Sequence, residues 1–462
     1  MKRRPLRRIS VGFAAAVSLL SLAQDASAQA WLKDRRFSEG PGYKTGDFEL
    51  HPGLGAEIGY DSNWFLRTSK TGAANGNPVD AATLRVTPSL VLQSLSPQRR
   101  EGQETPLPPP VSFRAAIAGT YREFFGGGGI SDQRNLSLNS DVRVEIMPQR
   151  PWTFAIIGGY IRTIRPNTNA NPDISFNTSN PYVGGELTWT PNNGTFDTTA
   201  AYTFNAILFE QSAGAPYTNF RHEIGYRNRW RFRPRTALFS DTTLGVITYN
   251  DANRAANVLT DSVPLRSRIG LNGLLTPRIA ALGSVGYGGS FYSTGRATTQ
   301  QFDSVIGQAE VRFYLTENPD ASEPGKVSLT QSSLGLGYVR DFENSYLSDF
   351  NEVNKGYANL SYFFGGRVLT NITGSVAAVG YPNLYVNNAA GAPVQVLAGF
   401  TAVRPEVQGY GEYRFTDSLA VNLTLTFAAN LTDANYTPPG NTLPFHLSWN
   451  RFQAFLGARW VM

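Results

Sequence analysis

The segment LSLNSDVRVEI, residues 136–146, alternates apolar and polar side chains at every second position. One face of an extended strand would carry Leu136, Leu138, Val142, Val144 and Ile146, and the other Ser137, Asn139, Asp141, Arg143 and Glu145. Successive side chains of a β-strand point to opposite faces, so this period of two predicts a strand with one apolar and one charged face. The same alternation recurs at 196–208 and at 419–427.

Alternation alone fits either a soluble β-sandwich or a membrane barrel, because it does not say which face meets water. Strand length and turn spacing favour the barrel. The alternating segments run about 12 to 16 residues, whereas strands of globular proteins average about 5 to 6 and membrane strands need about 9 to 11. Tight connections at 147–151, 190–194, 233–235, 276–278, 365–367 and 416–418 alternate with longer ones. Short turns on one rim and long loops on the other are typical of outer-membrane barrels.

We therefore predict an all-β fold: a transmembrane antiparallel β-barrel of about 18 strands, with short periplasmic turns and longer extracellular loops. The predicted strands are 47–60, 82–94, 111–125, 135–147, 152–164, 180–190, 195–209, 218–233, 235–249, 262–276, 278–292, 300–315, 327–340, 352–364, 368–381, 397–415, 418–431 and 445–462.

Composition and the N-terminus agree with export to the bacterial outer membrane. Residues 1–28 combine a basic start, a 13-residue apolar stretch from Val11 to Ala23 and an Ala-Ser-Ala cleavage site, which predicts a signal peptide. We expect a periplasmic extension at 29–46 and the barrel at 47–462. Beyond residue 23 no apolar run is long enough for a spanning helix, and the mean hydropathy is −0.25. The 462 residues include no cysteine, so stability must come without disulfides.

Charge argues against nucleic acid as a partner. The whole chain carries a net charge of +6. Removal of residues 1–28 takes away five basic residues and one acidic residue, which leaves +2. A nearly neutral chain lacks the basic stripe that binding to a phosphate backbone requires. The surface partner that we expect is outer-membrane lipid.

A barrel of 16 to 18 strands is wide enough to leave an aqueous channel, so the inward-facing side chains decide its selectivity. RHEIGYRNRWRF, residues 221–232, and LRSR, residues 265–268, place several arginines on one face. The predicted basic lining is Arg221, Arg227, Arg229, Arg231, Arg266 and Arg268, and the predicted acidic lining is Asp141, Glu145, Asp241 and Glu310. These residues form either a track for anionic solutes or a salt-bridged wall that stiffens the barrel.

Two predicted periplasmic connections, 96–110 and 316–326, are long, polar and rich in proline. They are either docking arms for a periplasmic partner or tolerated insertions. The prolines concerned are Pro106, Pro108, Pro109, Pro110, Pro319 and Pro324. His51, His222 and His446 stand apart without metal-ligand spacing, so we predict no catalytic residue, no metal site, no cofactor and no enzymatic activity.

The first two predicted strands resemble a known family. PGLGAEIGYDSNWF, residues 52–65, followed by ATLRVTPSLVLQS, residues 82–94, is similar to the opening of the β-barrel porin 2 family of proteobacterial outer-membrane proteins. Tyr60, Asp61 and Asn63 match the family's turn motif, which reads physically as an Asx-type cap that ends the first strand. The resemblance implies a channel for exopolysaccharide secretion that works with periplasmic polysaccharide-export proteins.

From these observations we predict a non-enzymatic outer-membrane channel, with secreted polysaccharide as its cargo on the strength of the family resemblance. Two alternatives stay open. One is a passive diffusion porin for small polar or anionic solutes. The other is a structural or surface barrel that conducts nothing.

Overall fold

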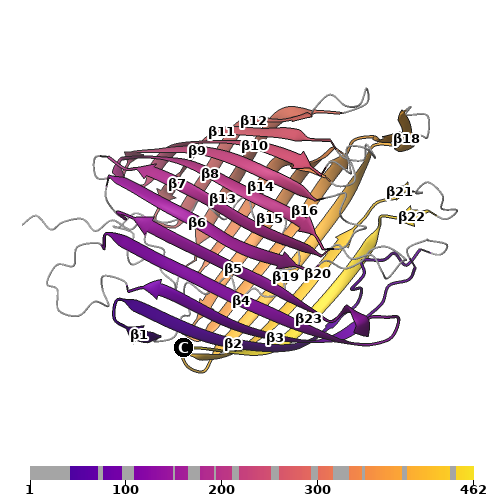
Figure 1. The fold of residues 1–462 in the computed structure, drawn as a ribbon, viewed down its shortest axis with the longest axis horizontal. Coiled ribbons are helices and arrows are strands. Elements are labelled where there is room, and N and C mark those ends of the chain that lie inside the picture. Colours follow the sequence, from indigo (N-terminus) through magenta and orange to yellow (C-terminus); the bar gives the residue numbers. More distant parts are fainter. Residues whose placement is uncertain are drawn as a thin grey trace, which may run out of the picture.

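The computed structural model describes residues 42–70, 76–95, 109–148, 151–164, 177–191, 194–210, 218–250, 260–292, 300–315, 332–345, 349–387, 393–436 and 444–462. Long antiparallel strands dominate it and run obliquely around a barrel (Figure 1). No helix in these ranges is long and apolar enough to cross a membrane. The predicted signal peptide and residues 29–41 of the predicted extension at 29–46 lie outside the described residues.

Eighteen strands form the barrel wall, each paired antiparallel with the next. They are β2 Phe48–Asp61, β3 Ala81–Ser94, β4 Val111–Phe125, β5 Asn135–Ile146, β6 Trp152–Thr163, β7 Thr178–Trp189, β8 Phe196–Phe209, β9 Asn219–Arg233, β10 Thr236–Tyr249, β11 Ser262–Thr276, β12 Ile279–Tyr292, β13 Phe302–Tyr314, β14 Ser333–Asn344, β15 Phe350–Phe364, β16 Val368–Tyr381, β19 Phe400–Arg414, β20 Leu419–Asn430 and β23 Trp449–Val461. The last strand pairs with the first from Gly53↔Val461 to Asp61↔Gln453, which closes the barrel. The predicted fold class is confirmed.

Short elements that the alternation does not reveal lie outside this wall. β1 (Tyr43–Thr45) forms a hairpin with the start of β2. Two small hairpins, β17 (Leu384–Asn387) with β18 (Pro393–Leu397) and β21 (Asn435–Tyr436) with β22 (Phe445–His446), stand in the long connections, and a 3₁₀ turn, η4, spans Ser131–Gln133. β14 departs most from its predicted range of 327–340, because it begins at Ser333 and continues four residues beyond the expected end.

Connections sort onto two rims, as predicted. Two residues join β9 to β10 and β11 to β12, and Gly365–Arg367 joins β15 to β16. Gly365 and Gly366 have φ of +53° and +75°, which a tight hairpin of this kind needs and glycine adopts without strain. We call this end the turn rim, where the long β3–β4 and β13–β14 connections also start and end, and the opposite end, where the other long connections lie, the loop rim. In outer-membrane barrels the short turns face the periplasm.

The apolar face of the strands is the outer one. On β9 the outward residues Ile224, Tyr226 and Trp230 are all about half exposed, while the arginines alternate with them on the inner face. Because an apolar band can remain exposed only toward lipid, this surface is the membrane-facing wall. The rings of Trp152 and Trp189 stack at 5.7 Å beside the turn rim, where aromatic girdles lie in such barrels. The chain is thus a protein of the bacterial outer membrane.

Candidate functional site: the charged inner wall

The six predicted basic residues lie on two strands, β9 and β11, that β10 separates. On β9 the positions 221, 227, 229 and 231 share the inner face, because the outward positions between them are the exposed apolar ones. On β11 Ile269 and Leu271 are half exposed on the outer face, which puts Arg266 and Arg268 inside. We call the inner face of β8 to β11 the basic wall.

Acidic side chains on neighbouring strands pair with several of these arginines. Arg227 donates through Nη2 to Asp241 Oδ2 at 2.8 Å, across the β9–β10 pairing. Arg229 reaches Asp197 of β8 with Nη2 at 2.7 Å from Oδ2, and Arg231 lies at 4.0 Å from the same oxygen. Asp241, which we predicted as an acidic lining residue, is therefore part of the basic wall.

The pair on β11 shares one carboxylate from a distant strand. Arg266 Nε lies 3.1 Å from Asp341 Oδ1 of β14, and Arg268 Nη2 contacts Asp341 Oδ2. Arg221, at the loop-rim end of β9, donates from Nε to Asn219 Oδ1 at 2.9 Å. The six arginines are accompanied by three carboxylates of the basic wall, those of Asp197, Glu223 and Asp241, and by that of Asp341 from β14, so they outnumber these four carboxylates by two.

Solvent reaches these ion pairs. The side chains of Arg227, Arg229 and Arg231 are 35%, 33% and 41% exposed. Each guanidinium has five N–H donors, and the contacts of Arg227 and Arg229 given above use only some of them. The basic wall can therefore offer donors to an anion in the lumen without breaking its own pairs.

The other predicted acidic residues stand on different parts of the wall, each beside an arginine. Asp141 Oδ2 accepts from Arg114 Nη1 at 2.6 Å, and Glu145 Oε1 accepts from Arg143 Nε at 2.7 Å. Glu310 accepts from Arg312 Nη2 at 2.7 Å and from the hydroxyl of Tyr357 at 2.7 Å; Arg312 and Tyr357 lie on β13 and β15. The structure therefore does not gather the four acidic residues into one site.

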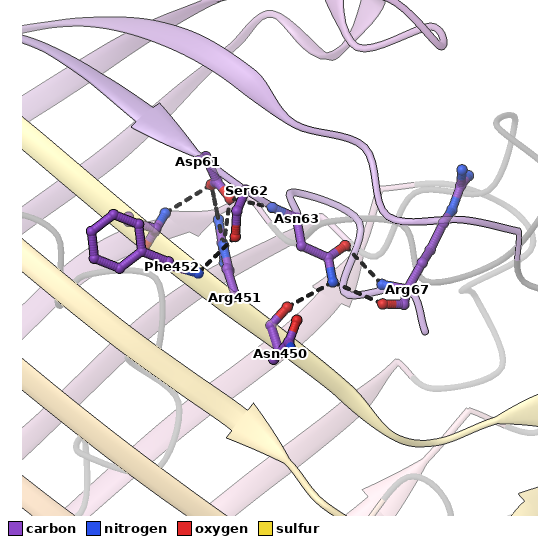
Figure 2. A network of polar contacts seen from close by, with 8 residues as sticks. Asp61, Ser62, Asn63, Arg67, Asn450, Arg451 and Phe452 are labelled. Carbon is purple, nitrogen blue, oxygen red and sulfur yellow. Dashed lines mark hydrogen bonds and ion pairs between the residues drawn. The ribbon is translucent and has the colours of Figure 1, made fainter. Parts of the chain in front are cut away.

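The family turn motif sits where the barrel closes (Figure 2). Asp61, the last residue of β2, accepts Arg451 Nη2 at 2.6 Å and Nε at 3.0 Å, and Arg451 belongs to β23. The backbone N–H of Asn63 donates to Asp61 Oδ1 at 3.1 Å, the geometry of an Asx turn. Tyr60 lies on the outer face, where its hydroxyl is 3.5 Å from Asp80 Oδ2.

Asn63 extends this contact across the closure. Its side-chain Nδ2 donates to the carbonyl oxygens of Arg67 and Asn450, both at 2.8 Å, while its Oδ1 accepts the N–H of Arg67 at 3.0 Å. The side chain is fully buried. We call the group of Asp61, Asn63 and Arg451 the closure cluster, because it ties the end of the first barrel strand to the last.

A second buried ion cluster lies toward the turn rim of the same region. Glu412 of β19 accepts from Arg459 of β23 at 2.6 and 2.8 Å and from Arg414 at 2.6 Å. Its side chain is 0% exposed, and that of Arg459 is 4% exposed. Sequence reasoning did not single out Arg451 or Arg459. The signal was available, because both lie opposite the apolar face of the last strand.

The proline-rich connections fall largely outside the described residues. Pro106, Pro108, Pro319 and Pro324 lie there, so their role as partner contacts remains a prediction. Pro109 and Pro110 are described at the start of β4, and the Pro110 carbonyl accepts the N–H of Met147 at 2.7 Å. Within the described ranges no group of three or more His, Asp or Glu side chains is arranged to hold a metal ion.

Comparison with known proteins gives similarity to solved barrels only. No family model matches the chain, so the likeness to the β-barrel porin 2 family stays a prediction, and no curated protein matches. Among solved structures, the outer membrane protein OpdK of Pseudomonas aeruginosa is 11% identical over 90% of this chain and 99% of that one, with a TM-score of 0.43. A mutant of the ferric enterobactin receptor PfeA of the same organism is 9% identical over 91% and 81%, with a TM-score of 0.44.

An anion-selective porin from Comamonas acidovorans is also similar, at 9% identity over 90% of this chain and 99% of that one, with a TM-score of 0.37. At these identities the likeness is one of fold. The functional argument below therefore rests on the residues of this chain.

Proposed function

We propose that the chain is an outer-membrane channel for small polar solutes that favours anions. The observation that carries the proposal is the basic wall: six arginines accompanied by four carboxylates, with the side chains of Arg227, Arg229 and Arg231 35%, 33% and 41% exposed. Rings and patches of charge on a pore wall set the sign of the ions that pass. An eighteen-stranded barrel is wide enough to leave water in its interior.

The proposal is tested by ion selectivity in planar bilayers. Under a KCl gradient, the refolded protein should give a steady conductance and a reversal potential of the sign expected for chloride preference. The double variant Arg227→Gln/Arg229→Gln should move the reversal potential toward potassium, because it removes two positive charges from the wall. Arg278→Gln, in the β11–β12 turn, is the control and should leave the reversal potential near that of the unaltered protein.

Two results would overturn this function. A protein that inserts and never conducts would favour the alternative of a structural barrel. A conducting protein that prefers cations, or whose selectivity the double variant leaves unchanged, would show that the arginines do not make the pore favour anions.

Polysaccharide secretion remains a separate prediction, supported by the family resemblance and by the proline-rich composition of 96–110 and 316–326. Deletion of residues 100–109 tests it. If this connection docks an export partner, the deletion should abolish polymer secretion while the barrel still folds and conducts. If the chain is a porin for small solutes, secretion and conductance should both stay as they were.

A further inference from the structure

The pairing between β13 and β14 stops halfway. It runs from Tyr314↔Ser333 at the turn rim to Gly307↔Arg340 and ends there. Both strands continue toward the loop rim with their other neighbours: β12 pairs with β13 up to Ser290↔Phe302, and β14 pairs with β15 up to Asn344↔Phe350. The wall therefore divides between two strands that are each well formed.

Beyond this point the two strands overlap. Phe342 lies on the face of β14 that carries the outward residues Leu336 and Tyr338, yet it is fully buried. Its ring stacks at 4.5 Å on that of Phe302, and Ile306 belongs to the same buried cluster. Phe302 and Ile306 lie on the inner face of β13, because Val305 between them points outward. The end of β14 thus lies on the lumen side of β13, and an apolar layer fills the slit between them.

Side chains replace the missing strand pairing. A continued register would place Phe342 opposite Val305. Instead, Asp341 Oδ1 accepts the Phe342 N–H at 2.8 Å, and Arg266 Nη2 donates to the Phe342 carbonyl at 2.6 Å. On the facing strand, Arg340 Nε donates to the Val305 carbonyl at 3.0 Å. Because an unsatisfied backbone group in lipid is costly, these bonds make the separated edges stable.

Arginines that are paired with carboxylates stand at both ends of the slit. At the lumen end, Arg266 and Arg268 hold Asp341, and the Arg266 guanidinium lies 4.1 Å from the centre of the Phe342 ring. At the outer end, Arg340 contacts Glu352 of β15 at 2.6 Å and Ser304 of β13 at 3.1 Å. An arginine on the lipid-facing side of a barrel strand lowers the stability of the barrel. The position of Arg340 beside the divided wall therefore needs an explanation.

We propose that this slit is a side passage for an amphipathic carboxylate, from the lumen to the outer leaflet of the membrane. The carboxylate takes the place of Asp341 on Arg266 and Arg268. Its apolar chain enters between Phe302 and Phe342 when their rings, which stack on each other and fill the slit in this structure, move apart, and its head group leaves past Arg340. The passage is distinct from the axial route of the proposed function, since it crosses the wall rather than following the barrel axis.

A cross-link across the outer end tests the passage. Ser304 and Glu352 touch the same guanidinium from opposite sides of the slit, and the chain has no cysteine of its own. The variant Ser304→Cys/Glu352→Cys can therefore be closed with a short bifunctional thiol reagent. The control is Ala378→Cys/Val403→Cys, a pair across the uninterrupted seam of β16 and β19.

The probe is palmitate with a photoactivatable diazirine, added to the protein in lipid nanodiscs, with labelled peptides mapped by mass spectrometry. We expect label at the segments that contain Phe302 and Phe342. The cross-link between positions 304 and 352 should reduce this labelling about tenfold or more, which corresponds to about 1.4 kcal/mol in affinity. The control cross-link should leave the labelling unchanged. KCl conductance should be the same in the two cross-linked variants. A negative result for the side passage can therefore be told apart from a negative result for the proposed channel function.

A pair of glycine variants gives a second test that needs no cross-link. A Cβ added at Gly288 would lie 2.7 Å from Ile306 Cγ2 and 2.9 Å from Phe342 Cε1, inside the slit, whereas one at Gly283 of the same strand meets open space. Gly288→Ala should reduce labelling by palmitate, and Gly283→Ala should not. Labelling spread evenly over the lipid-facing wall, or unchanged by both Gly288→Ala and the cross-link, would overturn the side passage.

Discussion

Arginine–carboxylate pairs serve two regions of the barrel interior in opposite ways. In the closure cluster, the side chains of Asp61 and Arg451 are 2% and 11% exposed, and the carboxylate takes two guanidinium N–H groups. In the basic wall, Arg227 and Asp241 are 35% and 32% exposed. A buried pair must be complete, because a lone buried charge is very costly. A hydrated pair adds little stability and keeps donors for a solute. The same chemistry thus closes the barrel in one place and can select ions in another.

The largest effect should follow from removing a cation from the closure cluster. Arg451→Gln leaves Asp61 buried without its charged partner, so the free energy of unfolding should fall by about 3–5 kcal/mol. Urea unfolding in detergent micelles measures it. Arg227→Gln in the basic wall is the matched control and should cost about 1 kcal/mol or less. Equal losses in the two variants would show that burial does not distinguish the regions.

A smaller loss is expected at Asn63. Asn63→Ala removes three hydrogen bonds that join the end of β2 to β23 and to the following loop. Asn63 is buried and the carbonyls of Arg67 and Asn450 both lose its donor, so we expect a loss of about 1–3 kcal/mol. Asn359→Ala removes one long contact, 3.5 Å to Asn371 Oδ1 on the half-buried inner wall, and should cost about 0.5 kcal/mol or less. The same unfolding assay compares them.

One substitution made in both regions separates stability from selectivity. Asp241→Asn should shift the reversal potential further toward chloride and change the free energy of unfolding by less than about 1 kcal/mol. Asp61→Asn should do the reverse, with a clear loss of stability and no change in reversal potential. A shift in selectivity from Asp61→Asn would mean that the closure cluster is also open to the ion path.

The smallest effect concerns the loop rim. Arg162 donates to both oxygens of Glu210, at 2.5 and 2.7 Å, and these bonds hold the pKa of the Glu210 carboxyl below its ordinary value. Because the folded pKa is the lower one, the stabilisation is present at neutral pH and is lost as pH falls through that folded value. Glu210→Gln should cost about 0.5 kcal/mol at pH 7 and progressively less as the pH falls through the folded pKa, in unfolding measured over a series of pH values. A cost that is independent of pH would exclude the ion pair as its cause.

Strand positions could be predicted because every strand must place apolar side chains toward lipid and polar side chains toward the lumen. At β9 and β11 alternation placed all six arginines on a single face, and the structure has them on the inner one. The prediction was poorest at β14. Arg340 sits on the outer face there, next to Asp341, and this break in the alternation was the signal that the sequence contained. It was missed because a single charged residue does not show that two strands separate.

Alternation, strand length and turn spacing together were enough to predict an antiparallel barrel, the face on which most side chains lie and the gathering of arginines on β9 and β11. It could not predict which carboxylate each arginine meets or how deeply the pair is buried. A period of two sets the face of a residue but not its neighbour. Barrel closure brings Asp61 to Arg451 across 390 residues, and the inward end of β14 brings Asp341 to Arg266 across 75. Both contacts arise only in the folded barrel, because they depend on the path of strands far apart in the chain.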